Sequence, residues 1–384
     1  MSGGHPRAGA LPDPQAATAR ALDRLRRYVE QETPSGDEAR ARALAATLAA
    51  DLAAAGAAAE RIDEPGWGAH VRARVPGREP GREPVVVLGH LDTVHPAGTL
   101  AQRPFRIAEG RAEGPGTYDM KAGLAVLVEA LHTLAAAGTA PRRPVTILVT
   151  CDEESGTGAS RPLIEETARG AAAVLVLEPP LPDGSAKTAR KGVATYRIRA
   201  LGRAAHAGVE PERGVSAIAE LAHQILRALA LADPARGTTV NVGVVRGGTA
   251  VNVVPAEAWA EVDVRFATAA ELARVDRALL ALEPVLPGAR LEVTRPDPRP
   301  PLERTEGVLR LYHHARALAR ELGFELGEGA TGGGSDGNWT AALGIPTLDG
   351  LGVRGGGAHA EDEHILIEDV PRRIALLARL LETL

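Results

Sequence analysis

The sequence is poor in sulfur: Cys151 is the single cysteine among 384 residues. One thiol excludes an intrachain disulfide and a thiolate zinc cluster. Any metal that the chain binds is therefore expected to be held mainly by His, Asp and Glu side chains.

The chain also lacks a basic excess, a long apolar run and a signal sequence. Lys and Arg number 44 against 49 Asp and Glu, and this net charge of −5 argues against a general nucleic-acid binder. The sequence has no stretch of about twenty apolar residues, so no membrane span is predicted. The opening MSGGHPRAGALPDPQAA has no apolar core of the kind that signal peptides carry. We therefore expect a cytoplasmic protein with no membrane or nucleic-acid partner, and a disordered tail over residues 1–14.

Strands and helices alternate along residues 15–187 and again along residues 299–384. Several of the expected strands are continuous apolar runs, such as PVVVLGHLDTV (84–94) and PVTILVT (144–150). Apolar strands of this kind, separated by helices, are typical of a sheet that is covered on both faces. The pattern predicts an α/β fold: one α/β/α domain with a mixed, mostly parallel sheet.

The pattern changes over residues 188–298. VATYRIRAL (193–201) alternates as a half-exposed strand, and the residues after it read as helix, strand, strand, helix and strand. This βαββαβ order is the ferredoxin-like arrangement. The Pro-rich segment Arg295–Glu303 then reads as a linker. A ferredoxin-like α+β domain is therefore predicted to be inserted into the α/β/α domain.

One expected core strand ends in an unusual cluster of acids. In ILVTCDEESGTG the apolar run is followed directly by Asp152, Glu153 and Glu154. Like charges at the end of a buried strand repel one another and are costly to desolvate. Solvent, a basic partner or a bound cation would offset that cost.

Other expected strand ends and loops carry His and acidic residues too. His90 and Asp92 lie two apart after a strand, Asp119 precedes a helix, Glu178 closes a strand, and His359 lies in a Gly-rich loop. Each has an ordinary alternative, such as a helix N-cap for Asp119 or a solvated loop residue for His359. Because sites in open α/β sheets form at the carboxyl ends of strands, the set as a whole favours a two-cation site with a bridging carboxylate.

The motifs GHLDTV, GPGTYDMKAG, DEESGTG, LEPP, TGGGSDGNW and GLGVRGGGAHAEDE occur in this order. Their sequence and spacing resemble the M20 family of co-catalytic zinc metallopeptidases, from about residue 16 to the end of the chain. The nearest subgroup is that of the glutamate carboxypeptidase-like, or carboxypeptidase G2-like, enzymes. Glu178 supports this subgroup, because many other relatives have Asp at that position.

The resemblance implies a ligand set for two Zn²⁺ ions per subunit. His90 and Glu178 would hold one ion, Glu154 and His359 the other, and Asp119 would bridge them. Mn²⁺ or Co²⁺ also suits such nitrogen and oxygen ligands. The family has a cis peptide directly after the bridging Asp, which here is the Asp119–Met120 bond. The α/β/α domain, residues 15–187 and 299–384, would thus be the catalytic one.

The resemblance also implies roles for residues that do not bind metal. Asp92 would orient His90, and Glu153 would be the general base. In the inserted domain, which in the family caps the site and forms a homodimer, His206 would polarise the scissile carbonyl. Asn252 and Arg265 would bind the free carboxylate of the substrate, and the glycine-rich loop would supply backbone contacts at two further positions, Thr331 and Gly334.

These roles describe hydrolysis of a peptide or N-acyl amide bond next to a C-terminal amino acid with a free carboxylate. The alternative within the hydrolases is an N-acyl-amino-acid deacylase, of the acetylornithine or succinyl-diaminopimelate type, or a dipeptidase. A phosphate-binding loop at TGGGSDG is disfavoured because the segment lacks the GK[ST] ending. A non-catalytic protein of the same fold is disfavoured because all the expected ligands and the base are present.

Several basic residues leave two interpretations open. They would line a pocket for an acidic substrate, or they are solvated surface charge, which is the commoner role of such residues. The residues concerned are Lys187, Arg190, Lys191, Arg203 and Arg213.

Overall fold

A computed structural model describes residue 11 and residues 13–384, which form two compact units. The first unit holds the described residues up to Thr188 together with Arg304–Ala330 and Ser335–Leu384. The second holds Ala189–Glu303 and Thr331–Gly334. Most of the predicted N-terminal tail lies outside the described residues. Helix α1 begins at Pro14, where the Asp13 side chain accepts a hydrogen bond from the Ala16 amide.

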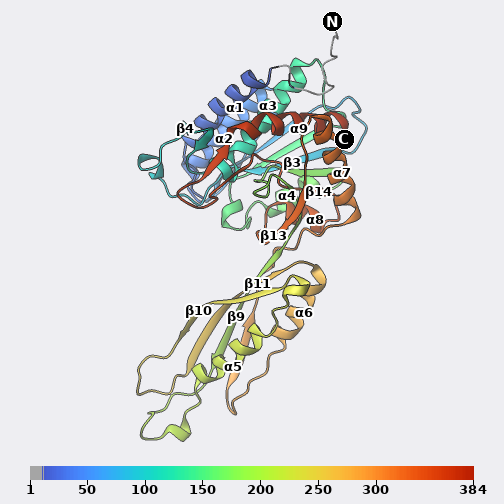
Figure 1. The fold of residues 1–384 in the computed structure, drawn as a ribbon. Coiled ribbons are helices and arrows are strands. Elements are labelled where there is room, and N and C mark those ends of the chain that lie inside the picture. The colour runs from blue at the N-terminus through green and yellow to red at the C-terminus, as the bar shows by residue number, and fades with distance from the viewer. Residues whose placement is uncertain (1–10, 12) are drawn as a thin grey trace. The chain divides into compact units, whose positions relative to one another are not determined.

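A six-stranded mixed sheet forms the centre of the first unit (Figure 1). Its order is β1-β2-β6-β3-β7-β14; β1, β2 and β6 pair antiparallel, and the pairs from β6 to β14 are parallel. The sheet is thus mostly parallel, as predicted. The strand bounds are β1 (Ala58–Glu64), β2 (Gly68–Val75), β3 (Val85–His90), β6 (Val145–Thr150), β7 (Ala173–Val176) and β14 (Thr347–Leu348).

Helices cover both faces of this sheet because successive side chains of a strand point to opposite sides. In β3, Val85 and Val87 join one hydrophobic cluster, whereas Val86 and Leu88 join the other. The first cluster is completed by α1 (Pro14–Val29), α2 (Glu38–Ala54), α3 (Ala122–Ala136), α7 (Glu306–Glu321) and α9 (Val370–Thr383). The second is completed by α4 (Arg161–Ala168) and α8 (Gly337–Ala342). The predicted α/β/α layering is confirmed (Figure 1).

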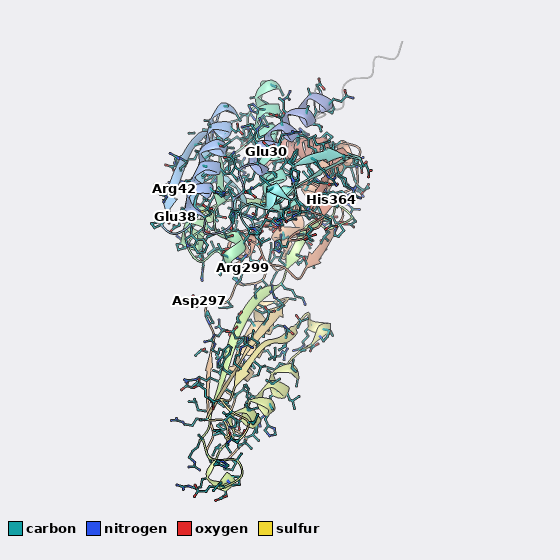
Figure 2. The ribbon with its side chains drawn as sticks, turned by 90° about the vertical axis from the view of Figure 1, so that its left-hand side faces the viewer. Glu30, Glu38, Arg42, Asp297, Arg299 and His364 are labelled. Carbon is teal, nitrogen blue, oxygen red and sulfur yellow. The ribbon has the colours of Figure 1, made fainter. Side chains whose placement is uncertain are left out.

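The polar face of α2 lies at the surface of the first unit. Glu38 and Arg42, one helical turn apart, form an ion pair of 2.8 Å there (Figure 2). Cys151, by contrast, is fully buried in the core, and burial raises the pKa of its thiol. Among the described residues, no helix is both long and apolar enough to cross a bilayer.

The structure also contains two smaller sheets. One has the order β15-β16-β5-β4, and the other joins β8 to β13. The first of them brings the C-terminal Gly-rich segment beside the segment that precedes Asp119. The bounds are β4 (Arg106–Ala108), β5 (Arg111–Glu113), β8 (Ala186–Arg190), β13 (Glu328–Thr331), β15 (Gly355–Gly356) and β16 (His364–Leu366).

The second unit has the predicted ferredoxin-like order. Its four strands pair antiparallel as β10-β11-β9-β12, and two helices pack on one face of the sheet (Figure 1). Side chains of the first strand alternate, with Ala194, Tyr196 and Ile198 buried beneath the helices. The bounds are β9 (Gly192–Leu201), α5 (Ala217–Leu229), β10 (Thr239–Gly247), β11 (Glu257–Phe266), α6 (Ala269–Leu280) and β12 (Arg290–Thr294).

Candidate metal centre

Parallel strand pairing brings the acids and histidines of the first unit to one edge of its sheet. His90 is the last residue of β3, Glu154 follows β6, and Glu178 follows β7. Because these three strands are parallel neighbours, their carboxyl ends meet. Asp119 lies in an irregular helical turn (Thr117–Lys121) before α3, and His359 lies in the loop between β15 and β16.

The carboxylate of Asp119 lies between the two histidines. Its Oδ1 is 3.2 Å from His90 Nε2, and its Oδ2 is 3.5 Å from His359 Nε2. One oxygen therefore faces each imidazole, as a bridging ligand requires. The Asp119–Met120 peptide bond is cis, as the resemblance implies.

Each histidine also faces a second carboxylate. His90 Nε2 lies 3.4 Å from Glu178 Oε1, and His359 Nε2 lies 3.2 Å from Glu154 Oε2. For bonds of about 2.0–2.1 Å in a tetrahedral arrangement, neighbouring ligand atoms lie about 3.3–3.4 Å apart. The spacing of these nitrogen and oxygen atoms therefore fits two cation positions that share Asp119.

The hydrogen-bond partners of His90 point to the same conclusion. Its Nδ1 faces the Asp92 carbonyl oxygen at 3.0 Å and the Asp92 Oδ1 at 3.4 Å, so Nδ1 carries a proton. Its Nε2 faces acceptors as well, on Asp119 and Glu178. Burial lowers the pKa of His90, but its hydrogen bonds with these carboxylates outweigh burial and raise it well above the usual value. In a neutral ring, Nε2 is free to bind a cation instead.

At His359, as at His90, two carboxylates face one imidazole. Hydrogen bonds with Asp119 and Glu154 raise the pKa of His359 to about 10. Burial raises the pKa of Glu154, whose Oε1 is buried and has no hydrogen-bond partner among the described residues. Burial also acts to raise the pKa of Asp119, but the hydrogen bonds from His359 and His90 outweigh it and hold that pKa far below the usual value. An orphaned buried carboxylate oxygen beside two imidazoles fits a cation ligand.

Asp92 holds the two adjacent glutamates as well as facing His90. Its Oδ1 accepts the Glu153 amide at 3.2 Å, and its Oδ2 accepts the Glu154 amide at 3.2 Å. The Ser35 hydroxyl donates to the same Oδ2 at 2.6 Å. The sequence indicated only the contact between Asp92 and His90, and it gave no sign of Ser35, which precedes Asp92 by more than fifty residues.

Glu153 lies close to the first half of the centre. One ligand atom each from Glu153, His90 and Glu178 lie within 4.8 Å of one another, and a second such group joins His90, Asp119 and Glu154. The turn that carries both glutamates is anchored by Asp336, which accepts the hydroxyls of Thr150 at 2.8 Å and Thr157 at 2.7 Å. Asp336 belongs to TGGGSDG, for which the sequence predicted only backbone contacts with substrate.

In the second unit, the predicted catalytic residue His206 and the predicted substrate-binding residue Asn252 lie in neighbouring segments. His206 and Val253 pair as an isolated antiparallel bridge, and the Ala207 amide donates to the Asn252 carbonyl at 2.9 Å. The exposed His206 ring accepts the Gly208 amide on Nδ1 at 3.2 Å. Because Nδ1 accepts, the proton of the neutral ring lies on Nε2, where it is able to donate to a carbonyl oxygen.

Arg265 lies on β11, where its Nε donates to Asp263 at 2.9 Å. The glycine-rich loop of the same unit, which includes Thr331 and Gly334, is held by Arg190 rather than left open. The Arg190 Nη1 donates to the carbonyls of Gly333 at 3.2 Å and Gly334 at 3.0 Å.

The basic residues differ in their exposure to solvent, and none of them is shown to line a pocket for substrate among the described residues. Arg203 and Arg213 are exposed, as expected for surface charge. Lys187 and Arg190 are only 8% and 4% exposed, so solvated surface charge is wrong for these two. Lys191 is partly buried, and its amide donates to the Thr331 carbonyl at 3.0 Å.

Known proteins are similar to this chain in sequence and fold over most of their length. The family model of peptidase family M20/M25/M40 matches residues 86–383. Carboxypeptidase G2 of Pseudomonas sp. strain RS-16 is 35% identical over 77% of this chain and 73% of its own. A succinyl-diaminopimelate desuccinylase of Verminephrobacter eiseniae is 30% identical over 78% of each chain. The crystal structure of aminopeptidase PepT from Bacillus cereus matches with a TM-score of 0.77 and 25% identity, over 95% of this chain and 98% of that one.

Proposed function

The chain belongs to peptidase family M20/M25/M40 and is a hydrolase of amide bonds, and on that premise we propose that it is a two-zinc enzyme of the glutamate carboxypeptidase type. Its substrate would be a small peptide or N-acyl amino acid, cleaved next to a C-terminal residue with a free carboxylate. The observation that carries the proposal is the Asp119 carboxylate, with one oxygen toward His90 and the other toward His359.

Five side chains would hold the two ions. His90 and Glu178 would bind one, Glu154 and His359 the other, and Asp119 both, in agreement with the ligand spacings above. When bound, such ions polarise a carbonyl oxygen and lower the pKa of a bound water toward neutrality. Mn²⁺ or Co²⁺ would satisfy the same oxygen and nitrogen ligands.

Glu153 would move the protons of the reaction. Its amide is fixed by Asp92, and its carboxylate lies near His90 and Glu178. In this proposal Glu153 takes a proton from the attacking water and gives it to the amine nitrogen as the C–N bond breaks. Asp92 keeps the Nδ1 proton on His90, so that Nε2 of that ring faces the centre.

The second unit would supply the groups that recognise the substrate. His206 Nε2–H would donate to the scissile carbonyl oxygen, a role that its hydrogen bond from Gly208 supports. Asn252 and Arg265 would bind the substrate carboxylate, since a guanidinium matches that group in a two-pronged manner. Arg265 would then share its charge between Asp263 and the substrate. The loop with Thr331 and Gly334 would add backbone contacts.

The inserted unit would also form a homodimer and cap the active site. In support, β10 is the last strand of its sheet, and Val245 on it is 48% exposed. Ile218 and Leu226 on α5 are also exposed. An unpaired strand edge and exposed apolar side chains suit an interface between two copies of the chain. Sedimentation of Leu226→Glu as a dimer identical to the wild type would contradict this interface.

A second candidate is an N-acyl-amino-acid deacylase, favoured by the 30% identity with a desuccinylase. A dipeptidase uses the same kind of centre. A panel of N-acyl glutamates, N-succinyl amino acids and dipeptides, tested on zinc-loaded protein, separates these activities. The carboxypeptidase proposal expects the highest kcat/KM on substrates with a C-terminal glutamate, and it fails if the succinyl compounds or dipeptides are preferred at least tenfold.

The role of Glu153 is tested by Glu153→Gln in zinc-loaded protein. A general base contributes about 10²–10⁴-fold, so kcat should fall by that factor while both ions are retained. The matched control is Glu166→Gln, an exposed residue on α4. Near-wild-type turnover of the metal-loaded Gln variant would falsify the assignment of Glu153 as the base.

A further inference from the structure

A buried carboxylate beside the metal centre holds the loop that carries Asp119. Glu363 is only 2% exposed. Its Oε1 accepts the amides of Tyr118 at 2.8 Å and Asp119 at 2.9 Å, and its Oε2 accepts the amide of Gly116 at 2.8 Å. Three backbone donors on one carboxylate fix the path of the chain over these residues.

The same carboxylate is connected to the loop that carries His359. Its Oε2 lies 2.6 Å from Nε2 of the buried His95. The Arg103 Nη2 lies 3.2 Å from His95 Nδ1, and because a guanidinium only donates, Nδ1 accepts and Nε2–H donates to Glu363. The Arg103 Nη1 then donates to the carbonyl of Ala360, which follows His359, at 2.9 Å.

Backbone pairing also connects the loops that carry Asp119 and His359. Glu363 precedes β16, whose first residue is His364 (Figure 2), and β16 pairs with β5 just before the Asp119 loop. The Gly114 amide donates to the Glu363 carbonyl at 3.3 Å. Gly116 has a φ of +72°, and a Cβ there would lie 2.5 Å from a Thr93 methyl carbon, so a larger residue does not fit at this point of the loop.

We propose that Glu363, through His95 and Arg103, is a positioning residue that fixes the distance between the Asp119 and His359 loops. The inference rests on the proposed function in that both loops supply metal ligands. The Asp119 carboxylate has to reach both imidazoles, and its reach is set by the backbone that Glu363 holds. A small shift of that backbone would move one Asp119 oxygen away from its cation. Glu363 would therefore act through the backbone, without touching the substrate or the side chain of a metal ligand.

The test is Glu363→Gln in the full-length protein, with zinc affinity measured by chelator competition. The amide keeps the shape of the side chain but turns a donor toward backbone N–H groups. Loss of outer contacts of this kind typically weakens metal binding by about 10–100-fold, and we expect that range. The exposed Glu361→Gln removes the same charge two residues away and should leave zinc affinity unchanged.

The visible spectrum of the Co²⁺-loaded protein reports ligand geometry and does not change with a general loss of stability. We expect altered d–d bands in Glu363→Gln and wild-type bands in Glu361→Gln, because ligand geometry changes only in the first. Wild-type zinc affinity together with wild-type Co²⁺ bands in Glu363→Gln would overturn the proposal.

His95→Leu keeps the inference testable if Glu363→Gln does not fold. This variant leaves the three backbone donors on Glu363 in place and cuts the connection toward Ala360. A smaller loss of zinc affinity than in Glu363→Gln is expected, and the double variant should lose less than the product of the two single losses, because the residues act in one chain of contacts. Unchanged zinc affinity in His95→Leu would contradict the connection between the loops.

These readouts are independent of the proposed reaction. Wild-type protein that binds zinc but cleaves none of the amide panel would contradict the proposed function, while zinc affinity and Co²⁺ spectra would still decide the role of Glu363. Normal hydrolysis by the wild type with unchanged metal binding in both variants would contradict only the positioning role.

Discussion

The two units hold their candidate functional side chains in different ways. In the first unit, His90 and Asp92 are each 1% exposed, and Asp92 alone accepts three hydrogen bonds from other loops. In the second, His206 is exposed and its ring accepts a single local amide. His90 and Asp92 are thus held in place before any metal binds, whereas His206 stays accessible, which suits the roles proposed for these residues.

The strongest test of the comparison is to replace Asp119, the residue that we propose is shared by both cation positions. Asp119→Asn keeps the side-chain shape, but its amide NH₂ presents no ligand to one of the two sites. We expect the loss of one or both zinc ions and of activity by roughly 10³-fold or more, because metal polarisation contributes several kcal/mol. Zinc content by mass spectrometry and turnover measure this, with the exposed Asp63→Asn as control. A fully loaded, active variant would show that Asp119 does not bridge.

A substitution in the second unit should lower kcat without changing metal binding. His206→Ala removes the proposed donor to the carbonyl oxygen, so kcat should fall by about 10²–10³-fold with zinc content unchanged. His223→Ala removes an exposed histidine of α5 and serves as control. If His206→Ala instead lowers zinc content, the division of roles between the two units is wrong.

Proton release on zinc binding is specific to the first unit. The pKa of His359 is about 10 in the absence of metal, so below that pH the ring carries a proton that zinc has to displace. Zinc affinity should therefore rise with pH, by up to about tenfold per unit for each proton displaced. Calorimetry in two buffers of different ionisation enthalpy at pH 7 measures the released protons, and equal apparent enthalpies in both buffers would contradict the prediction.

The smallest effect expected is a loss of stability confined to the second unit. The Thr268 hydroxyl accepts the Glu271 amide at 3.2 Å at the start of α6. Thr268→Ala should lower the free energy of unfolding by about 0.5–2 kcal/mol, and Thr268→Ser should restore it. Zinc affinity should not change in either variant. Urea unfolding followed by circular dichroism, beside a zinc titration, checks both statements.

Much of the fold, and the meeting of three candidate ligands at one sheet edge, was predictable because both follow from local pattern. Apolar runs at β3, β6 and β7 indicated a parallel sheet, and parallel strands place His90, Glu154 and Glu178 at one edge. The roles of these ligands, and of Asp119 and His359, came from the resemblance and remain predictions that metal analysis has to test.

The supporting contacts were not predictable because they join groups that lie far apart in the sequence. Glu363 accepts the Gly116 amide across 247 residues, and no spacing in the sequence marks that pair. Ser35 and Asp336 act in the same way, through loops whose paths depend on the whole unit. The burial of Arg190 was not predictable because two of its acceptors are glycine carbonyls, which carry no signal in side-chain patterns.

The burial of Cys151 makes the chain a convenient background for site-directed labelling. Its sole native thiol is withdrawn from solvent, so reagents should leave it unmodified while they react with cysteines introduced at the surface. One spin label on the exposed face of α2 and another on the exposed face of α5 would report the separation of the two units in solution, with and without a product analogue.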